Sequence, residues 1–394
     1  MDILFLSRWY PFPPDNGSKL RIYQLLMGLS KAHRVTLLSF IDPLSFNMKP
    51  LEQFENISII NVVPWQTYKP ESLRSKIGFF NAAPRFLVDT YSSQMETLIR
   101  NTIARHNYDL VIASELSMAS YYSCFEHLPA LFEDIELGPF YDQMQMAGSL
   151  IKRLRLSLTW YKLRNYFSRL LTSFQSCTVP SERERWLFTN SFPKHEEKIE
   201  VIPNCINVKD YESVQIGLKP NYLVFSGSFQ FQANYEAMNW FVREVYPKVL
   251  ERMPAVHLVI TGDHANLPLP NAKNIILAGY VNDIKSLIAS CSVSIAPLQS
   301  GGGTRLKILE AMALGTPVVA TSKGAEGIDA INGDDLLIAD DPNSFAECVL
   351  SILQNNDLRS HLAMNAHRLV AEKYNWEKTM PCFLQLVEYI GQHR

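Results

Sequence analysis

The sequence lacks the features that mark several large classes of protein. Its six cysteines lie far apart among 394 residues and form no CxxC pair, so neither a disulfide framework nor a zinc site is indicated. No stretch reaches the roughly 18 apolar residues of a transmembrane helix. The charge is nearly balanced, with 37 Lys and Arg against 39 Asp and Glu, and gives no signal for a nucleic-acid partner. We therefore expect a globular protein of a reducing, cytoplasmic compartment.

Common nucleotide and metal motifs are also missing. No GxxxxGK[ST] segment is present, which disfavours P-loop phosphoryl transfer, and SGSFQF after the apolar run at Tyr222 is not a GxGxxG turn. The acidic segment FEDIE contains Glu133, Asp134 and Glu136 but has no second acidic cluster to complete a divalent-cation site. We expect no metal ion there and interpret the segment as a solvated loop or a polar contact of a cleft.

Short apolar runs alternate with helical patterns along the chain, which is typical of βαβ units on a parallel sheet. The alternation begins with DILFLS, stops in a polar segment at residues 190–221, and restarts with YLVFSGS. This pattern predicts an α/β protein with two doubly wound domains, residues 1–195 and 196–374, and a C-terminal helix at 375–394 that packs back on the first domain. Because such sheets bind ligands at the carboxyl ends of their strands, we expect the site in a cleft between the domains.

The segment SGGGTRLKILEAMALG, residues 300–315, carries the strongest local signal. Three glycines lead to Thr304, a predicted N-cap, and apolar residues recur at helical spacing until Gly315. The first turn holds Arg305 and Lys307 and no acid, although the partial positive charge of a helix N-terminus disfavours cations. An anion bound by the loop and the helix start would compensate this charge. The alternative is that both cations extend into water from a surface loop.

Two further features bear on such an anion. Glu310 shares a helix face with Lys307, so it either forms an i, i+3 ion pair with that lysine or accepts the two hydroxyls of a ribose. The spacing leaves both readings open. A second acid-free helix start follows Gly17, with Lys19 and Arg21 close behind it. Two such helix starts facing one cleft indicate a ligand that carries phosphates.

Over nearly its whole length the chain resembles retaining glycosyltransferases of the GT-B fold, family 4. The resemblance is carried by YPFPPDNGSKLRIYQLLMGLSKAHRVTLLSF, VIPNCINV, FSGSFQFQANYEAMNWFVREVYP and, above all, APLQSGGGTRLKILEAMALGTPVVATSKGAEGI. It implies two Rossmann-like domains facing a cleft, with the acceptor bound by the first domain and a nucleotide-sugar donor by the second.

The resemblance also assigns roles to individual residues. Glu310 matches the glutamate that binds the nucleotide ribose, and Gly17 matches the glycine whose N–H meets the donor phosphate. Glu115, in ASELSMASYY, occupies the region where the family often places a histidine that faces the sugar. The donor-binding set is completed by Gly227 after the YLVFS run and by the backbone of the base-binding loop at Tyr280 and Val281.

The sequence departs from the family pattern in two ways. The family has a first glutamate, which contacts the donor sugar, eight positions before the second, and this chain has Gly302 there. Its role is expected to pass to the backbone of Gly302 and Gly303 and to Thr304. The family's usual Arg and Lys after the strand resembling YLVFSG are also absent, and Arg305 and Lys307 are the expected replacements.

The activity implied by the resemblance is transfer of a sugar from a nucleotide-diphosphate donor such as a UDP-sugar, with retained anomeric configuration and no metal cofactor. It would serve polysaccharide, glycolipid or glycoconjugate assembly. The candidate catalytic residues are Arg305 and Lys307, which would stabilise charge on the leaving diphosphate, together with Glu115. Two alternatives stay open, a sugar-nucleotide epimerase of the same fold and a non-catalytic sugar-nucleotide-binding subunit.

Residues 151–174 bear on the acceptor, which is expected to be a glycan, a lipid-linked sugar or a small molecule. They contain six Lys and Arg and no acid, interleaved with Leu, Trp and Tyr. Such a basic amphipathic helix could rest on anionic lipid as a peripheral contact at the inner face of the membrane. The alternative is a helix that packs on the first sheet and keeps a solvated basic face.

Overall fold

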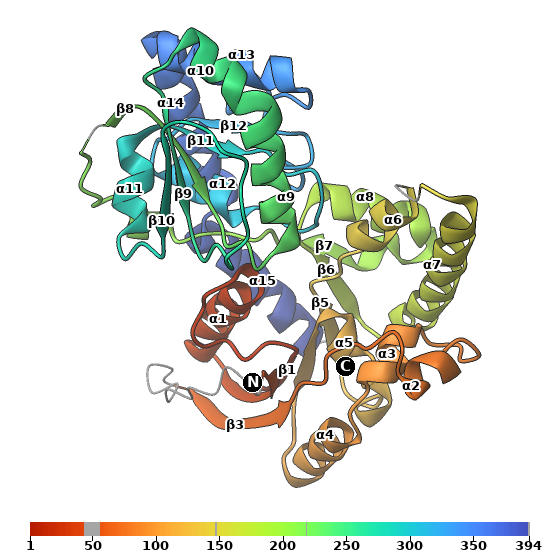
Figure 1. Cartoon of the computed structure of the whole chain (residues 1–394). Helices are drawn as coiled ribbons and strands as arrows, with labels where there is room; N and C mark the ends of the chain where they lie inside the picture. The colour runs from red at the N-terminus through yellow and green to blue at the C-terminus, as the bar shows by residue number, and fades with distance from the viewer. Residues whose placement is uncertain (43–55, 146–147, 218, 393–394) are drawn as a thin grey trace. The chain divides into compact units, whose positions relative to one another are not determined.

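The computed structural model describes residues 1–42, 56–145, 148–217 and 219–392. Contacts divide the chain into two compact units, each with its own parallel sheet (Figure 1). The first unit comprises Met1–Pro203 and Met380–Arg394, and the second comprises Asn204–Thr379.

The first unit is built on a seven-stranded sheet in the order β3-β2-β1-β4-β5-β6-β7, in which all neighbours are parallel. The order reverses between β1 and β4, and the carboxyl ends at such a point form the crevice in which open α/β sheets bind ligands. The central strands are buried on both faces, as their continuous apolar runs predict. The strands are β1 (Asp2–Ser7), β2 (Arg34–Ile41), β3 (Ile57–Pro64), β4 (Leu110–Ser114), β5 (Ala130–Glu133), β6 (Ser176–Val179) and β7 (Ile199–Val201).

Helices connect these strands and close the core of the first unit. In α1 (Gly17–Ser30), the apolar residues Ile22, Leu25 and Leu29 are buried at helical spacing. Farther along the chain, Phe132 of β5 stacks on Phe167 with ring centroids 5.8 Å apart. The other helices of this unit are α2 (Leu73–Ile77), α3 (Arg85–Thr90), α4 (Ser93–Arg105), α5 (Glu115–Ala119), α6 (Gly138–Gln145), α7 (Leu150–Leu171) and α8 (Glu182–Ser191).

The second unit has a six-stranded parallel sheet in the order β10-β9-β8-β11-β12-β13. Its order reverses between β8 and β11, so the carboxyl ends of these two strands define a second crevice. The strands are β8 (Lys219–Ser226), β9 (His257–Thr261), β10 (Ile275–Gly279), β11 (Cys291–Ala296), β12 (Val318–Ala320) and β13 (Leu337–Ile338). The helices are α9 (Gln232–Trp240), α10 (Tyr246–Arg252), α11 (Ile284–Ser290), α12 (Leu306–Ala313), α13 (Pro342–Gln354) and α14 (Asn356–Lys373).

The units divide at different residues from those that the sequence predicts. The first unit continues past 195 to Pro203, because β7 pairs with β6 and so joins the first sheet. The last helix, α15 (Trp376–Gln392), contributes its residues from Met380 onward to the first unit, where Met380 lies against Gly28 of α1. Residues 393–394 of the expected C-terminal helix lie outside the described residues.

A buried ion pair joins α1 to the centre of the first sheet. Arg21 is 2% exposed; its Nε donates to Oε1 of Glu133 at 2.6 Å and its Nη1 donates to the carbonyl oxygen of Ile202 at 2.9 Å. The hydroxyl of Ser114 donates to the other carboxylate oxygen of Glu133 at 2.5 Å. The pair therefore connects α1, the ends of β4 and β5, and the segment that follows β7. Burial raises the pKa of Glu133, and the charge of Arg21 opposes this rise.

We expect Arg21→Met to lower the free energy of unfolding of the first unit by about 3–5 kcal/mol, because it leaves a buried carboxylate without its cation. The loss should be smaller near pH 5 than near pH 8, since the uncompensated Glu133 becomes neutral as the pH falls. Denaturant unfolding at the two pH values checks this. The control is Arg34→Met, which removes the partner of Asp2 at the surface and should change little. Equal effects of the two substitutions would contradict the prediction.

Candidate functional site

Helix α12 begins directly after the glycine loop that follows β11. The prediction that Thr304 caps this helix is wrong, because Arg305 occupies the N-cap position and no side chain caps the first turn. The amides of Leu306 and Ile308 donate to the carbonyls of Thr304 and Arg305, so the helix starts one residue later than expected. The hydroxyl of Thr304 is buried and has no hydrogen-bond partner among the described residues. The predicted end of the helix at Gly315 is confirmed, with φ +69° just past α12.

Lys307 is enclosed at the carboxyl end of β8. Its Nζ donates to Oδ1 of Asn234 at 2.9 Å and lies 4.2 Å from the ring centroid of Phe225. A Cβ on Gly227 would stand 2.8 Å from this nitrogen, so the amine depends on a glycine backbone at that position. Burial, reinforced by the charge of Arg305, lowers the pKa of Lys307 to about 7. The amine is therefore near its titration point at neutral pH and would gain a proton beside an anion.

Arg305 binds the glycine loop from which it emerges. Its Nη1 donates to the carbonyl oxygen of Gly302 at 2.6 Å, and its Nη2 donates to that of Ser300 at 3.4 Å. Gly301 and Gly303 have φ values of +93° and +79°, which a residue with a side chain rarely adopts. The guanidinium thus fixes a loop whose backbone only glycine permits, and neither Arg305 nor Lys307 simply extends into water.

Glu310 lies one helical turn beyond Lys307. The hydroxyl of Tyr211 donates to its Oε1 at 3.2 Å, and Nζ of Lys285 lies 4.3 Å from the Tyr211 ring centroid. Burial raises the pKa of Glu310, while Tyr211, Lys285 and Lys307 oppose the rise. Among the described residues, no ion pair forms between Glu310 and Lys307, so the i, i+3 pair allowed by the sequence is not made. One carboxylate oxygen is oriented by Tyr211, and the other can accept further hydrogen bonds.

The second unit brings most of its predicted site residues together. Tyr280 and Val281 follow β10, which β9 separates from β8, and the Tyr280 side chain is 86% exposed. Sequence reasoning missed Asn234 and Tyr211, whose contacts with α12 span 73 and 99 residues. The residues that gather around the start of α12 are Gly227, Gly302, Gly303, Thr304, Arg305, Lys307 and Glu310.

The first unit places Glu115 and Gly17 at the carboxyl edge of its own sheet. Glu115 follows β4 with φ +66°, and Nε1 of Trp9 donates to its Oε1 at 2.7 Å. Burial, more than any other effect, raises the pKa of Glu115 to about 8. Gly17 is the first residue of α1, directly after the N-cap Asn16, whose side chain accepts from the amide of Lys19 at 3.0 Å.

The cations near the start of α1 differ from those of α12. Lys19 pairs with Asp15 at 2.8 Å, and Arg21 is held by Glu133. The cations near the start of α1 therefore already have carboxylate partners, which the sequence did not indicate. Near the start of α12, by contrast, Lys307 contacts the neutral amide of Asn234.

The acidic segment FEDIE makes hydrogen bonds and an ion-pair contact within the first unit. Glu133 accepts from Arg21 and Ser114, and Asp134 lies 3.6 Å from Nε of Arg21. Burial raises the pKa of Glu136 to about 8. Within the described ranges, no group of three or more His, Cys, Asp and Glu side chains is arranged to hold a metal ion.

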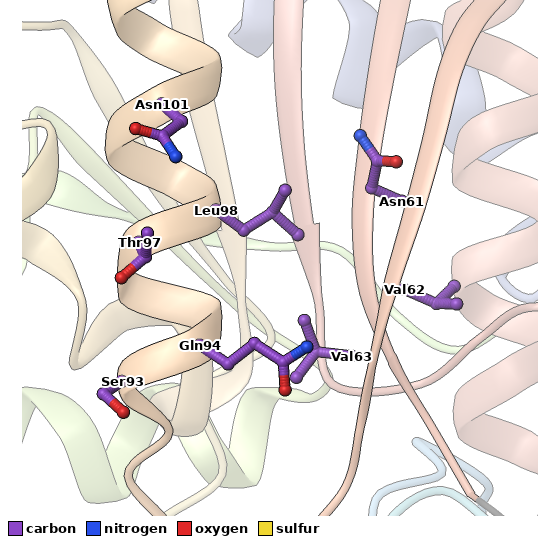
Figure 2. A pocket seen from close by; sticks show the side chains of 8 residues that line it. All are labelled: Asn61, Val62, Val63, Ser93, Gln94, Thr97, Leu98 and Asn101. Carbon is purple, nitrogen blue, oxygen red and sulfur yellow. The ribbon is translucent and has the colours of Figure 1, made fainter.

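A surface pocket of about 480 Å³ lies between β3 and α4 (Figure 2). Its lining carries amide and hydroxyl side chains around the apolar Val63 and Leu98, without a charged group. Because β3 is the outermost strand of the first sheet, the pocket lies away from the β1–β4 reversal. It contains none of the predicted site residues.

Part of the chain is similar in sequence to known glycosyltransferases. Residues 220–355 match the family described as glycosyl transferases group 1. An uncharacterised 44.6 kDa protein of the cps region of Klebsiella pneumoniae is 28% identical over 230 residues, 55% of this chain and 59% of that protein. The lipopolysaccharide core biosynthesis glycosyltransferase LpsE of Rhizobium meliloti is 28% identical over 150 residues, 36% of this chain and 44% of that protein. The similarity spans about half the length of these relatives.

The fold is shared along the whole chain. HepE of Anabaena, solved in complex with UDP, has a TM-score of 0.66 and 15% sequence identity over 99% of this chain and 100% of that chain. Two Rossmann-like parallel-sheet units of this kind define the GT-B fold, so the predicted fold class is confirmed. Within that fold, residues 220–355 of the second unit are the part that matches the glycosyl transferases group 1 family.

In the absence of a ligand, the enclosed amine of Lys307 should lower the free energy of unfolding of the second unit. Its pKa of about 7 is below the ordinary value of 10.5, so between these values the unfolded chain binds more protons and stability rises with pH. We expect Lys307→Met to unfold at a higher temperature than the wild type near pH 6, with a smaller difference near pH 9. Thermal scans check this, with the exposed Lys248→Met as control. A lower unfolding temperature for Lys307→Met at both pH values would show that the Asn234 contact dominates.

Proposed function

We propose that the chain is a retaining glycosyltransferase of family 4 that moves a sugar from a nucleotide-diphosphate donor to an acceptor in glycan assembly. The observation that carries the proposal is the ammonium of Lys307 against Gly227 at the start of α12. A cation at the positive end of a helix dipole needs an anion to offset both. The UDP complex of HepE and the name of LpsE support a nucleotide donor and a role in glycan synthesis.

The diphosphate would bind at the start of α12. Nζ of Lys307 would contact its oxygens, while Arg305 would hold the glycine loop and add positive charge. Glu310, oriented by Tyr211, would accept the ribose hydroxyls. The backbone at Tyr280 and Val281 would contact the base, and the N–H of Gly17 would meet the donor phosphate, as in the family that the sequence resembles.

The chemical step would be a front-face displacement. The bond from the anomeric carbon to the diphosphate oxygen breaks while a bond to the acceptor oxygen forms on the same face, so the configuration is retained. The acceptor proton passes to a phosphate oxygen, and no protein nucleophile is needed. Lys307 and Arg305 stabilise the charge that builds on the leaving diphosphate. Because these cations meet that charge, we propose a metal-independent reaction, whose rate EDTA should leave unchanged.

Glu115 would face the sugar from the first unit. With a pKa of about 8 this carboxyl is largely protonated at neutral pH. Since Trp9 donates to one oxygen, the protonated oxygen can donate to a sugar hydroxyl. In this proposal Glu115 is a neutral hydrogen-bond donor at pH 7 and not a general base.

UDP affinity should depend on pH through Lys307. If UDP binds the protonated amine, the association constant should fall up to about tenfold per pH unit above pH 7, and binding should take up a proton. Calorimetry in buffers of different ionisation enthalpy measures both effects. Lys307→Arg keeps its charge at these pH values and should bind with little pH dependence. The same pH dependence in wild type and Lys307→Arg would exclude Lys307 as the titrating group.

Turnover should depend on both cations. We expect Arg305→Ala and Lys307→Ala each to lower kcat about 10²-fold or more, as loss of one preorganised charge contact does. Lys248→Ala, at an exposed position of α10, is the matched control. Donor consumption and product formation with candidate acceptors measure the effect. Near-wild-type turnover in both site variants would overturn the proposed mechanism.

The glycine at position 302 favours one alternative, a non-catalytic subunit that binds sugar nucleotides. That protein would bind the donor in calorimetry without hydrolysis or transfer to any acceptor. An epimerase would instead convert the donor in the absence of an acceptor, and product analysis of the same incubation distinguishes the three activities.

A further inference from the structure

Two apolar segments of the first unit are exposed although they are distant in sequence. In the first half of α7, Leu150 and Ile151 are 79% and 83% exposed, and in the segment after α2, Phe80 is 95% exposed. Helix α7 contacts the segment after α2 near its middle, where Nζ of Lys162 donates to the carbonyl oxygen of Asn81 at 3.1 Å and also to that of Phe79. Figure 1 draws α7 and the α2–α3 region on the same side of this unit. Monomeric proteins rarely expose apolar side chains in such groups.

The exposed residues of α7 form one stripe. Leu150, Leu154, Leu158 and Tyr161 recur three or four residues apart and so lie on a single helix face. The buried face belongs to the second half of the helix, at Leu163, Phe167, Leu170 and Leu171. The first half therefore contributes little to the core of the unit and presents its apolar face to solvent.

Positive charge surrounds this stripe. At 3.6 residues per turn, Arg153 and Arg164 fall on one flank of the stripe, and Arg155 and Lys162 fall on the other. No acid occurs in α7, and α2 adds Arg74 and Lys76 beside its exposed apolar side chains Leu73 and Ile77. An apolar stripe bordered by cations is the arrangement of helices that lie in the headgroup region of a bilayer.

We propose that residues 73–80 and 150–161 together form a docking surface for an anionic lipid bilayer. The apolar side chains enter the acyl boundary, and the flanking cations contact anionic headgroups. A second copy of the chain fits less well, because the two cationic surfaces would repel each other. In the described part of the chain, no helix is both long enough and apolar enough to cross a bilayer. The proposal does not depend on sugar transfer.

Co-sedimentation of the full chain with vesicles tests the charge requirement. We expect binding to vesicles of phosphatidylcholine mixed with phosphatidylglycerol and little binding to phosphatidylcholine alone. Replacing Arg153, Arg155 and Arg164 by Gln should weaken partitioning about 100-fold, since each cation near an anionic surface contributes about fivefold. The matched control replaces the exposed Lys31, Arg105 and Lys194 by Gln, which changes the net charge equally and should leave partitioning nearly unchanged.

The apolar requirement is tested with Leu150→Gln/Ile151→Gln/Leu154→Gln and, separately, with Phe80→Ser. Each should weaken partitioning at least about tenfold, because each removes large apolar side chains from the inserted face. Met364→Gln, at an exposed apolar position of the second unit, is the control. Because all of these side chains are exposed, circular dichroism should show unchanged folding.

Three results would overturn the docking surface. The first is that the chain does not sediment with anionic vesicles at low salt. The second is that the control charge substitutions weaken vesicle binding as much as those of α7. The third is that the chain forms a dimer, which the α7 apolar substitutions dissociate, while neither the dimer nor the monomer binds vesicles. The last would assign the surface to contact between copies of the chain. Thermal shift by UDP in the same variants reports on the proposed donor site, so failure of one proposal is distinguishable from failure of the other.

Discussion

The site of the second unit depends on a lysine amine that is enclosed at the positive end of α12 and is near its titration point at neutral pH. Nothing in the first turn of that helix offsets the charge, and Arg305 adds to it. The place of the amine is fixed by the sheet, because Gly227 at the end of β8 leaves room for Nζ. Gly262 is required in turn, since a Cβ there would stand 2.8 Å from the backbone of Gly227, and its φ is +94°. The close approach of the ends of β8 and β9 therefore also fixes the position of the lysine amine.

The two helix starts show how similar local sequences acquire different functions. Both α1 and α12 lack an acid in the first turn, yet Arg21 of α1 meets Glu133, which lies 112 residues away at the end of β5. In this buried pair Glu133 compensates the charge of Arg21, and the pair stabilises the first unit. Lys307 meets the amide oxygen of Asn234, which is neutral and leaves the positive charge in place. The distant partner, and not the helix start itself, therefore decides whether the cation is paired with a carboxylate or with a neutral amide.

Local pattern was sufficient for much of the fold. The apolar runs predicted β1, β8 and β11, and Gly315 marked the end of α12, because these features depend on neighbours in sequence. The short strand β13, with two residues, has too little pattern to be recognised. In the site, Lys307 and Glu310 stand within one motif, whereas Tyr211 and Asn234 reach them only through the tertiary fold. The Thr304 cap was wrong because the helix begins one residue later, and the amides of Leu306 and Ile308 donate to backbone carbonyls.

Under the proposed function, the same loop would separate recognition of the diphosphate from recognition of the sugar. At position 302 the family that the sequence resembles has a carboxylate, which accepts hydrogen bonds from sugar hydroxyls. Here the glycine has no side chain, and its carbonyl accepts from Arg305. Under the proposed function, the sugar would therefore meet backbone amides and a guanidinium where relatives offer an acceptor. Phosphate binding rests on charge and on the dipole of α12, neither of which this change removes. Under the same proposal, the glycine would alter the polarity of the sugar contact and leave the phosphate contact unchanged.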